Sequence, residues 1–106
     1  MKTLSKKVLY KILMLDRANK ELVEALEWYM DQQDGLDAKF IDQFEIDATV
    51  ILKRPLIYPR IKRGYRQVLM ETFPYFIVYS VNRKAGIVSI VSIFHTSRHP
   101  KQKFRK

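Results

Sequence analysis

The chain has 106 residues, of which 47% are hydrophobic and 29% charged, as in an ordinary globular protein with one core. It contains no cysteine, which excludes a disulfide scaffold, a cysteine-based zinc site and a thiol nucleophile. Residues 1–53 carry 8 basic and 10 acidic side chains, whereas residues 54–106 carry 12 basic and one acidic, within a net charge of +9. The second half is therefore expected to meet an anionic partner.

The first strand and the first helix follow from apolar patterning. Residues 8–15 are rich in Val, Ile, Leu and Tyr on both faces, so we expect a strand inside a sheet rather than at an open edge. Asp16 is the expected N-cap of a helix over residues 17–32. Trp28 lies on the flank of the apolar stripe of that helix, where it either covers the edge of the core or contacts a partner. The stripe consists of Ala18, Leu22, Ala25, Leu26 and Tyr29.

A second helix and three further strands complete the pattern. Asp34-Gly35 turns the chain into a helix over residues 36–53, which Pro55 ends, so the two helices form an antiparallel hairpin. Residues 96–106 form a basic tail that we expect to be flexible until it is bound. Between the second helix and this tail, a basic loop over residues 54–64 leads to strands over residues 65–71, 75–81 and 87–95.

The order β-α-α-β-β-β predicts an α+β fold in a single domain of residues 1–106. The helical hairpin must bury its stripe against one face of an antiparallel-rich sheet, because no other element is available. The other face of the sheet is then open to a ligand. Tyr75 and Phe76 point to opposite faces of their strand, so one of them should be buried.

The residue inventory excludes most enzyme classes. There is no glycine-rich phosphate loop, and two histidines with one acidic residue after position 53 cannot supply a metal site or a Ser-His-acid triad. The helical acids are expected on the solvent face, which leaves no paired catalytic carboxylates. We therefore predict no metal and no cofactor.

What remains is a basic surface with interleaved aromatic residues, suited to RNA or DNA. Its expected contacts with nucleic acid or another target are Arg60, Lys62, Arg63 and Arg105.

Metal-free RNA cleavage is the catalytic activity that these residues could support. His95, at the end of the last strand, is the best titratable group for acid or base catalysis. Arg66 and Arg98 could stabilise the charge on the phosphate. The alternative interpretation is that His95 merely ends a strand and forms local hydrogen bonds.

The amino-terminal region does not read as a targeting segment. Lys11 interrupts the apolar run of residues 8–15, Asp16 and Arg17 follow it, and no small-residue cleavage site appears. The run is also too short to span a membrane. We expect a cytoplasmic protein.

Nearly the whole chain resembles the RelE/ParE superfamily of bacterial toxins from type II toxin–antitoxin, or plasmid stabilisation, systems. The Phe-Pro-Tyr strand followed by His-x2-Arg-x-Pro is the more specific part of the resemblance, and the order of all the matching pieces strengthens it. These pieces are the first-helix stripe with Tyr29, Gly35-Leu36, Pro55, Tyr58-Pro59, Arg66, Phe73-Pro74-Tyr75-x-Ile77-x-Tyr79 and His95-x2-Arg98-x-Pro100.

The resemblance implies a toxin that is neutralised by a cognate antitoxin. RelE-like members cleave mRNA in the ribosomal A site, and ParE-like members poison DNA gyrase without known catalysis. Arg66 matches the strand arginine of the family and His95 the histidine of some nucleolytic members. However, Thr96 stands where some nucleases have Tyr, and Phe104 stands where the tail aromatic is often Trp. The Phe-Pro-Tyr strand is closer to ParE-like sequences.

Both targets stay open at this stage, as does a plain nucleic-acid-binding module or an inactive toxin homologue. The expected partners are an acidic, partly disordered antitoxin and either mRNA on the ribosome or DNA gyrase, with no membrane and no small-molecule cofactor. Trp28 is the candidate anchor for the antitoxin.

Overall fold

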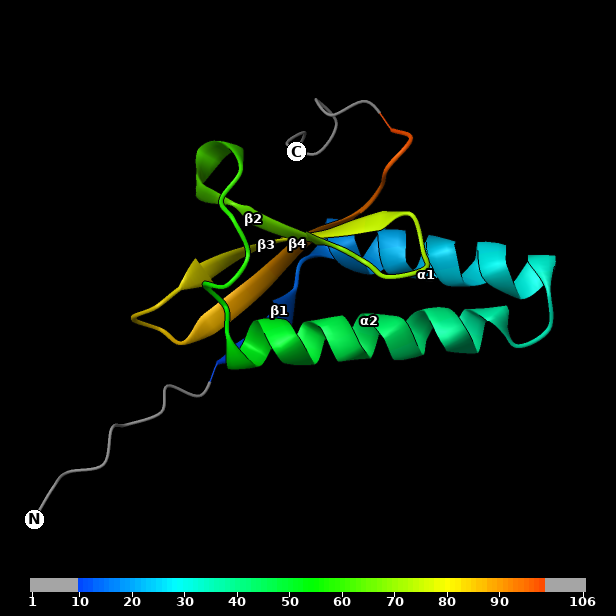
Figure 1. Cartoon of the computed structure of the whole chain (residues 1–106), viewed down its shortest axis with the longest axis horizontal. Coiled ribbons are helices and arrows are strands. Elements are labelled where there is room, and N and C mark those ends of the chain that lie inside the picture. The colour runs from blue at the N-terminus through cyan, green and yellow to red at the C-terminus, as the bar shows by residue number, and fades with distance from the viewer. Residues whose placement is uncertain (1–9, 99–106) are drawn as a thin grey trace, which may run out of the picture.

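In the computed structural model, which describes residues 10–98, two helices lie against a four-stranded mixed sheet (Figure 1). The elements are β1 (Lys11–Met14), α1 (Asp16–Gln32), α2 (Leu36–Lys53), the short 3₁₀ helix η1 (Lys62–Gly64), β2 (Arg66–Leu69), β3 (Tyr75–Asn82) and β4 (Ile87–His95). The predicted α+β class and element order are confirmed.

The first strand is shorter than predicted and lies in a different place. The sheet order is β1-β4-β3-β2, with β1 parallel to β4 and the other two pairings antiparallel, so β1 is an edge strand. Residues 8 and 9 lie outside the described residues. Ile12 and Met14 pack against the core, whereas Leu13 is half exposed. The apolar composition of both faces therefore does not reflect an interior position, and that prediction is wrong.

The start of α1 also differs from the prediction. Leu15 occupies the N-cap position with extended dihedral angles and makes no side-chain cap, and Asp16 is the first residue of the helix. A carboxylate in the first turn still interacts favourably with the positive end of the helix dipole. Asp16 therefore acts by charge rather than by capping.

The helical hairpin forms as predicted. Gly35 takes a φ of 82° between the helices, a left-handed conformation that a residue without Cβ adopts at little cost. Arg54 and Pro55 follow the last residue of α2, where the predicted helix ends. The hairpin buries Ala18 and Ala25 of α1 and Phe40 and Ile51 of α2 against the sheet.

The sheet contributes an aromatic and aliphatic face to the same core. Tyr75 stacks edge to face on Phe40, with ring centroids 5.3 Å apart, whereas Phe76 is only half buried on the other face, so the prediction that one of the pair is buried is confirmed. Val78 and Phe94 alternate with the helix-facing residues of their strands and so point to that other face, yet they are almost fully buried. This face is thus covered at its centre, and less open than the sequence predicts.

Candidate functional site

The predicted target-binding loop is a well-ordered projection built on β2. A bridge pairs Arg60 with Arg66, and the Ile61 N–H donates to the Tyr65 carbonyl at 2.7 Å, which makes the loop a narrow hairpin. Its tip is η1, where Arg63 takes a left-handed φ of 61°. Arg60, Lys62 and Arg63 are all exposed on this projection. The loop therefore presents three cations on one hydrogen-bonded hairpin.

Arg66 holds this loop rather than lining an open site. Its Nη1 donates to the Tyr58 carbonyl at 2.7 Å and to the Leu56 carbonyl at 3.4 Å. The hydroxyl of Tyr79, the register partner of Arg66, donates to the Pro55 carbonyl at 2.8 Å. Burial raises the pKa of Tyr79 to about 12, and the nearby guanidinium partly offsets this effect. Together the two side chains fix the exit from α2.

His95 forms the local hydrogen bonds that the alternative interpretation predicts. Its Nδ1 accepts from the Ser97 N–H at 3.0 Å and lies 2.7 Å from the Ser97 hydroxyl. Its ring meets Tyr75 edge to face, with centroids 5.0 Å apart. With the N–H of Ser97 as donor, Nδ1 is an acceptor, so the proton of the neutral ring lies on Nε2.

The three residues proposed for RNA cleavage are not brought together. Arg66 pairs with Tyr79 and His95 with Tyr75, so the two register partners are four positions apart on β3, a distance of roughly 13 Å along the strand. Arg98 lies beside His95, because its N–H donates to the His95 carbonyl at 3.0 Å. The structure thus joins His95 with Arg98 and leaves Arg66 at the far end of the sheet.

Glu21 is the residue that sequence reasoning missed. Its carboxylate is buried, and Oε1 accepts from the Ser92 hydroxyl at 2.8 Å and from the Ile93 N–H at 3.0 Å. Its Oε2 lies 3.5 Å from Nη1 of Arg98 and 3.4 Å from Nε of Arg17. The prediction that the acids of the helices lie on the solvent face is therefore wrong at this position. The available signal was the spacing, because position 21 lies three residues after Ala18 and four before Ala25 on the buried stripe.

A cleft of about 270 Å³ lies between α1 and the end of β4. Trp28 lines it with 58% of its surface exposed, opposite Arg98, whose side chain is half exposed. Burial, with the neighbouring Tyr29, raises the pKa of Tyr75 at this cleft to about 12, so its hydroxyl stays neutral. The cleft thus combines an exposed aromatic ring with Arg98, which pairs with Glu21, and with the exposed carboxylate of Glu24.

Residues 10–98 contain no cluster of three His, Cys, Asp or Glu side chains that could hold a metal ion. None of the helices in the same range is long and apolar enough to cross a membrane. Arg105, the fourth predicted target contact, lies outside the described residues.

A comparison with protein families decides the class of the molecule. The model of the ParE toxin of the type II toxin–antitoxin system parDE matches residues 12–100. The chain belongs to the ParE toxin family. The resemblance to the RelE/ParE superfamily seen in the sequence is thereby confirmed. No curated protein matches the chain.

The ParE fold is also found among solved structures. A chain of the chromosomal ParDE toxin–antitoxin system from P. aeruginosa matches with a TM-score of 0.71 over 86% of this chain and 100% of that chain. At 14% sequence identity the likeness concerns the fold. The ParE family and its fold are therefore established, and the choice of target is a separate question.

Proposed function

We propose that this ParE family member is the toxin of a type II toxin–antitoxin module and inhibits bacterial growth in the cytoplasm by acting on DNA gyrase, without cleaving RNA. The proposal is supported above all by the separation of Arg66 from His95, with each side chain engaged in local hydrogen bonds. Metal-free RNA cleavage requires a proton-transfer group and cations around one phosphate. A non-catalytic inhibitor has no such requirement, and the exposed loop with Arg60, Lys62 and Arg63 serves it as a binding surface.

The experiment that tests this proposal uses the purified protein in two reactions. In a supercoiling reaction with DNA gyrase and relaxed plasmid, we expect the product to decrease as the toxin is added. In a translation reaction, we expect mRNA on the ribosome to remain intact. Cleavage of ribosome-bound mRNA with unaffected gyrase would favour the RelE-like function instead. Inactivity in both reactions, together with normal growth on expression, would favour an inactive homologue or a plain nucleic-acid-binding module.

We also propose that the antitoxin contacts the cleft between α1 and β4. Trp28 offers an exposed aromatic surface and Arg98 a partly exposed cation, a combination that suits an acidic segment with an apolar anchor. A disordered, acidic antitoxin segment would fold on binding there and be steered by the positive charge of the toxin.

Replacement of Trp28 by Ala should weaken antitoxin binding by about 2 kcal/mol, or roughly 30-fold. The measurement is calorimetry with the peptide encoded by the adjacent reading frame. Met30→Ala is the matched control, because Met30 is 55% exposed on the same helix and does not line the cleft. Equal affinities for the two variants would remove Trp28 from the interface.

A further inference from the structure

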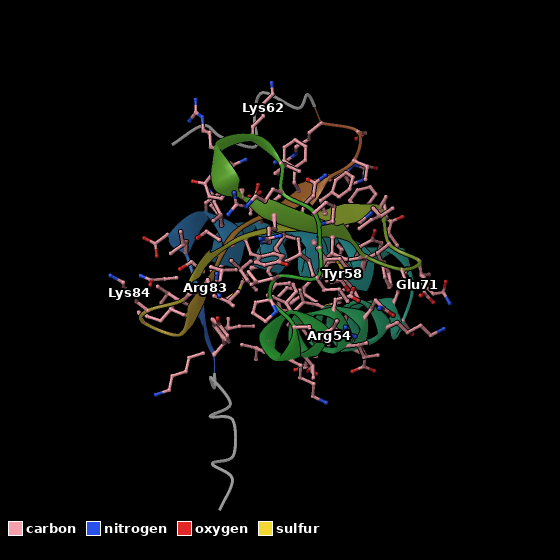
Figure 2. The ribbon with its side chains drawn as sticks, turned by 60° about the vertical axis from the view of Figure 1, so that its left-hand side comes forward. Arg54, Tyr58, Lys62, Glu71, Arg83 and Lys84 are labelled. Atoms are coloured by element: carbon pink, nitrogen blue, oxygen red, sulfur yellow. The ribbon has the colours of Figure 1, made fainter. Side chains whose placement is uncertain are left out.

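Three segments bring basic side chains to one end of the molecule; the first two follow each other in the sequence, and the third comes about 20 residues later. They are the carboxyl end of α2 with Lys53 and Arg54, the tip of the 54–65 loop, and the β3–β4 turn with Arg83 and Lys84 (Figure 1). Figure 2 views this end and shows Lys62, Arg54 and the pair Arg83 and Lys84 on three different sides of it. We call it the basic end, and it consists of Lys53, Arg54, Arg60, Lys62, Arg63, Arg83 and Lys84.

No acidic side chain interrupts the segments that form the basic end. Residues 53–70 and 82–98 contain neither Asp nor Glu. Three acidic residues, Asp31, Asp34 and Asp37, surround the turn at the other end of the hairpin. Because α1 and α2 have 17 and 18 residues, the two ends lie roughly 25 Å apart. The molecule is thus electrically polar along the helical hairpin.

The basic side chains stand on ordered turns. The Asn82 side chain accepts from the Ala85 N–H at 3.0 Å, and the Gly86 N–H donates to the Asn82 carbonyl at 2.9 Å, which closes the β3–β4 turn. At the loop tip, the Tyr65 N–H donates to the Lys62 carbonyl. Cations on such turns lose little backbone freedom on binding, which favours affinity. Lys53 has a local role as well, since a cation near a helix carboxyl end stabilises the dipole, but Arg83 and Lys84 have no such role.

The chemistry of this end suits a phosphate backbone better than an acidic peptide. A peptide that folds on binding needs apolar anchors, and the cleft with Trp28 lies at the carboxyl end of β4, away from the β3–β4 turn. Leu56 and Ile57 are exposed near the basic end, but they line neither the cleft with Trp28 nor a groove on α2. Duplex DNA carries one negative charge per about 1.7 Å of its axis, so separate groups of cations can each meet a phosphate without any apolar pocket.

We propose that the basic end binds the phosphate backbone of duplex DNA, with Arg54, Arg83 and Lys84 as contacts in addition to the loop cations. The binding is independent of base sequence. One part of this proposal rests on the proposed function: the DNA that is bound is the segment held by gyrase during inhibition. Toxin and gyrase would then share one DNA segment, with the toxin held beside the enzyme by its basic end.

The test is fluorescence anisotropy with a labelled 30-base-pair duplex and the full-length protein, at 50 and 200 mM salt. With five or six phosphate contacts, affinity should fall roughly 500- to 2,000-fold between these concentrations. The double variant Arg83→Ala with Lys84→Ala should bind roughly 10-fold more weakly and show a salt slope lower by about 2. The matched control replaces the exposed Lys20 and Lys39 of the helices by Ala, which removes the same charge and should bind like the parent.

Circular dichroism should show that all the variants are folded, since exposed charges contribute little to stability. Equal binding by the two double variants would overturn the proposal, as would equally tight binding of polyglutamate, which carries the charge without the duplex. The supercoiling reaction keeps this proposal separate from the proposed function. A parent protein that inhibits gyrase but does not bind the duplex would overturn only the DNA contact, whereas a parent protein that binds the duplex but does not inhibit gyrase would overturn only the proposed function.

Discussion

Glu21 shows how one buried carboxylate can organise three parts of a small toxin. β1 pairs with β4 only as far as Ile90, so the Ile93 N–H beyond it has no strand partner on that side. The Glu21 carboxylate supplies the acceptor, and it forms an ion pair with Arg98 of the segment that follows β4. A buried acid is stable in such a place because hydrogen bonds and cations compensate for its lost hydration. Glu21 therefore links α1, β4 and the residues that line the cleft.

Replacement of Glu21 by Ala should reduce the free energy of unfolding by about 3 kcal/mol, because the Ile93 N–H and the Ser92 hydroxyl lose their acceptor. Glu21→Gln keeps an acceptor oxygen and should cost less, about 1–2 kcal/mol. Urea denaturation measures both. The control is Glu27→Ala, at an exposed position of the same helix, which should change stability by less than about 0.5 kcal/mol. If Glu21→Ala and Glu27→Ala are equally stable, the carboxylate has no organising role.

The residue scale is also where the sequence is least informative. The buried stripe of α1 is visible from its spacing, but a glutamate on that stripe looks like any surface acid until its partners are known. Those partners, Ser92 and Ile93, lie about 70 positions away, and the need for an acceptor arises from a sheet edge that only the fold creates. Likewise, Arg66 and His95 could be named as a pair, but only the strand register shows their separation.

At the scale of elements, the Tyr79 hydroxyl joins β3 to the exit of α2 and makes stability depend on alkaline pH. Burial raises the pKa of Tyr79 in the folded chain to about 12, from an ordinary value of 10.0. The unfolded state therefore releases this proton first, so the stabilisation is complete below about pH 10 and is lost as the pH rises through 12. Tyr75, raised to the same value, acts in the same direction.

Tyr79→Phe should cost about 1–2 kcal/mol at pH 7, because the Pro55 carbonyl loses its buried donor. The same variant should lose less stability than the parent between pH 10 and pH 12. Thermal unfolding followed by circular dichroism across this range checks both effects. Identical slopes for variant and parent would show that Tyr79 does not supply the alkaline sensitivity.

The turn between β2 and β3 contains local strain. Thr72 has a φ of 76°, and a left-handed conformation is unfavourable for a β-branched residue. Thr72→Asn should relieve part of this cost, because Asn tolerates that region, and should raise the melting temperature by about 2–6 °C. The exposed Thr49 of α2 provides the control Thr49→Asn, for which we expect no increase. A lower melting temperature for Thr72→Asn would show that the threonine side chain is required at this turn.

The elements themselves were largely predictable. Helical spacing and the breakers Gly35 and Pro55 place both helices within one residue of their observed bounds, because these signals are local. The position of β1 was not predictable, since an apolar strand of four residues fits an edge or an interior equally well. Its parallel pairing with β4 joins the first and the last strand of the chain, and such a long-range contact leaves no local signal in the sequence.

At the scale of the whole molecule, the charge division of the sequence becomes a division in space. The acids of the hairpin turn lie at one end and the cations of three separate segments at the other (Figures 1 and 2). The sequence identified Arg60, Lys62 and Arg63 because they are adjacent in one loop. It could not add Arg83 and Lys84, because only the fold brings the β3–β4 turn to the same end.

The central claim is that this ParE toxin acts on gyrase through its cations and without catalysis by His95. Supercoiling of relaxed plasmid by gyrase tests it most directly, with the parent, His95→Ala and the triple variant Arg60→Ala, Lys62→Ala and Arg63→Ala compared at equal concentration. We expect His95→Ala to inhibit within about threefold of the parent, whereas the triple variant, folded by circular dichroism, should lose at least about 10-fold in potency. Undiminished inhibition by the triple variant would show that the loop cations do not bind the target. A parent protein that leaves gyrase unaffected but cleaves ribosome-bound mRNA would contradict the central claim, if replacement of His95 lowered that cleavage by about 10²–10⁴-fold.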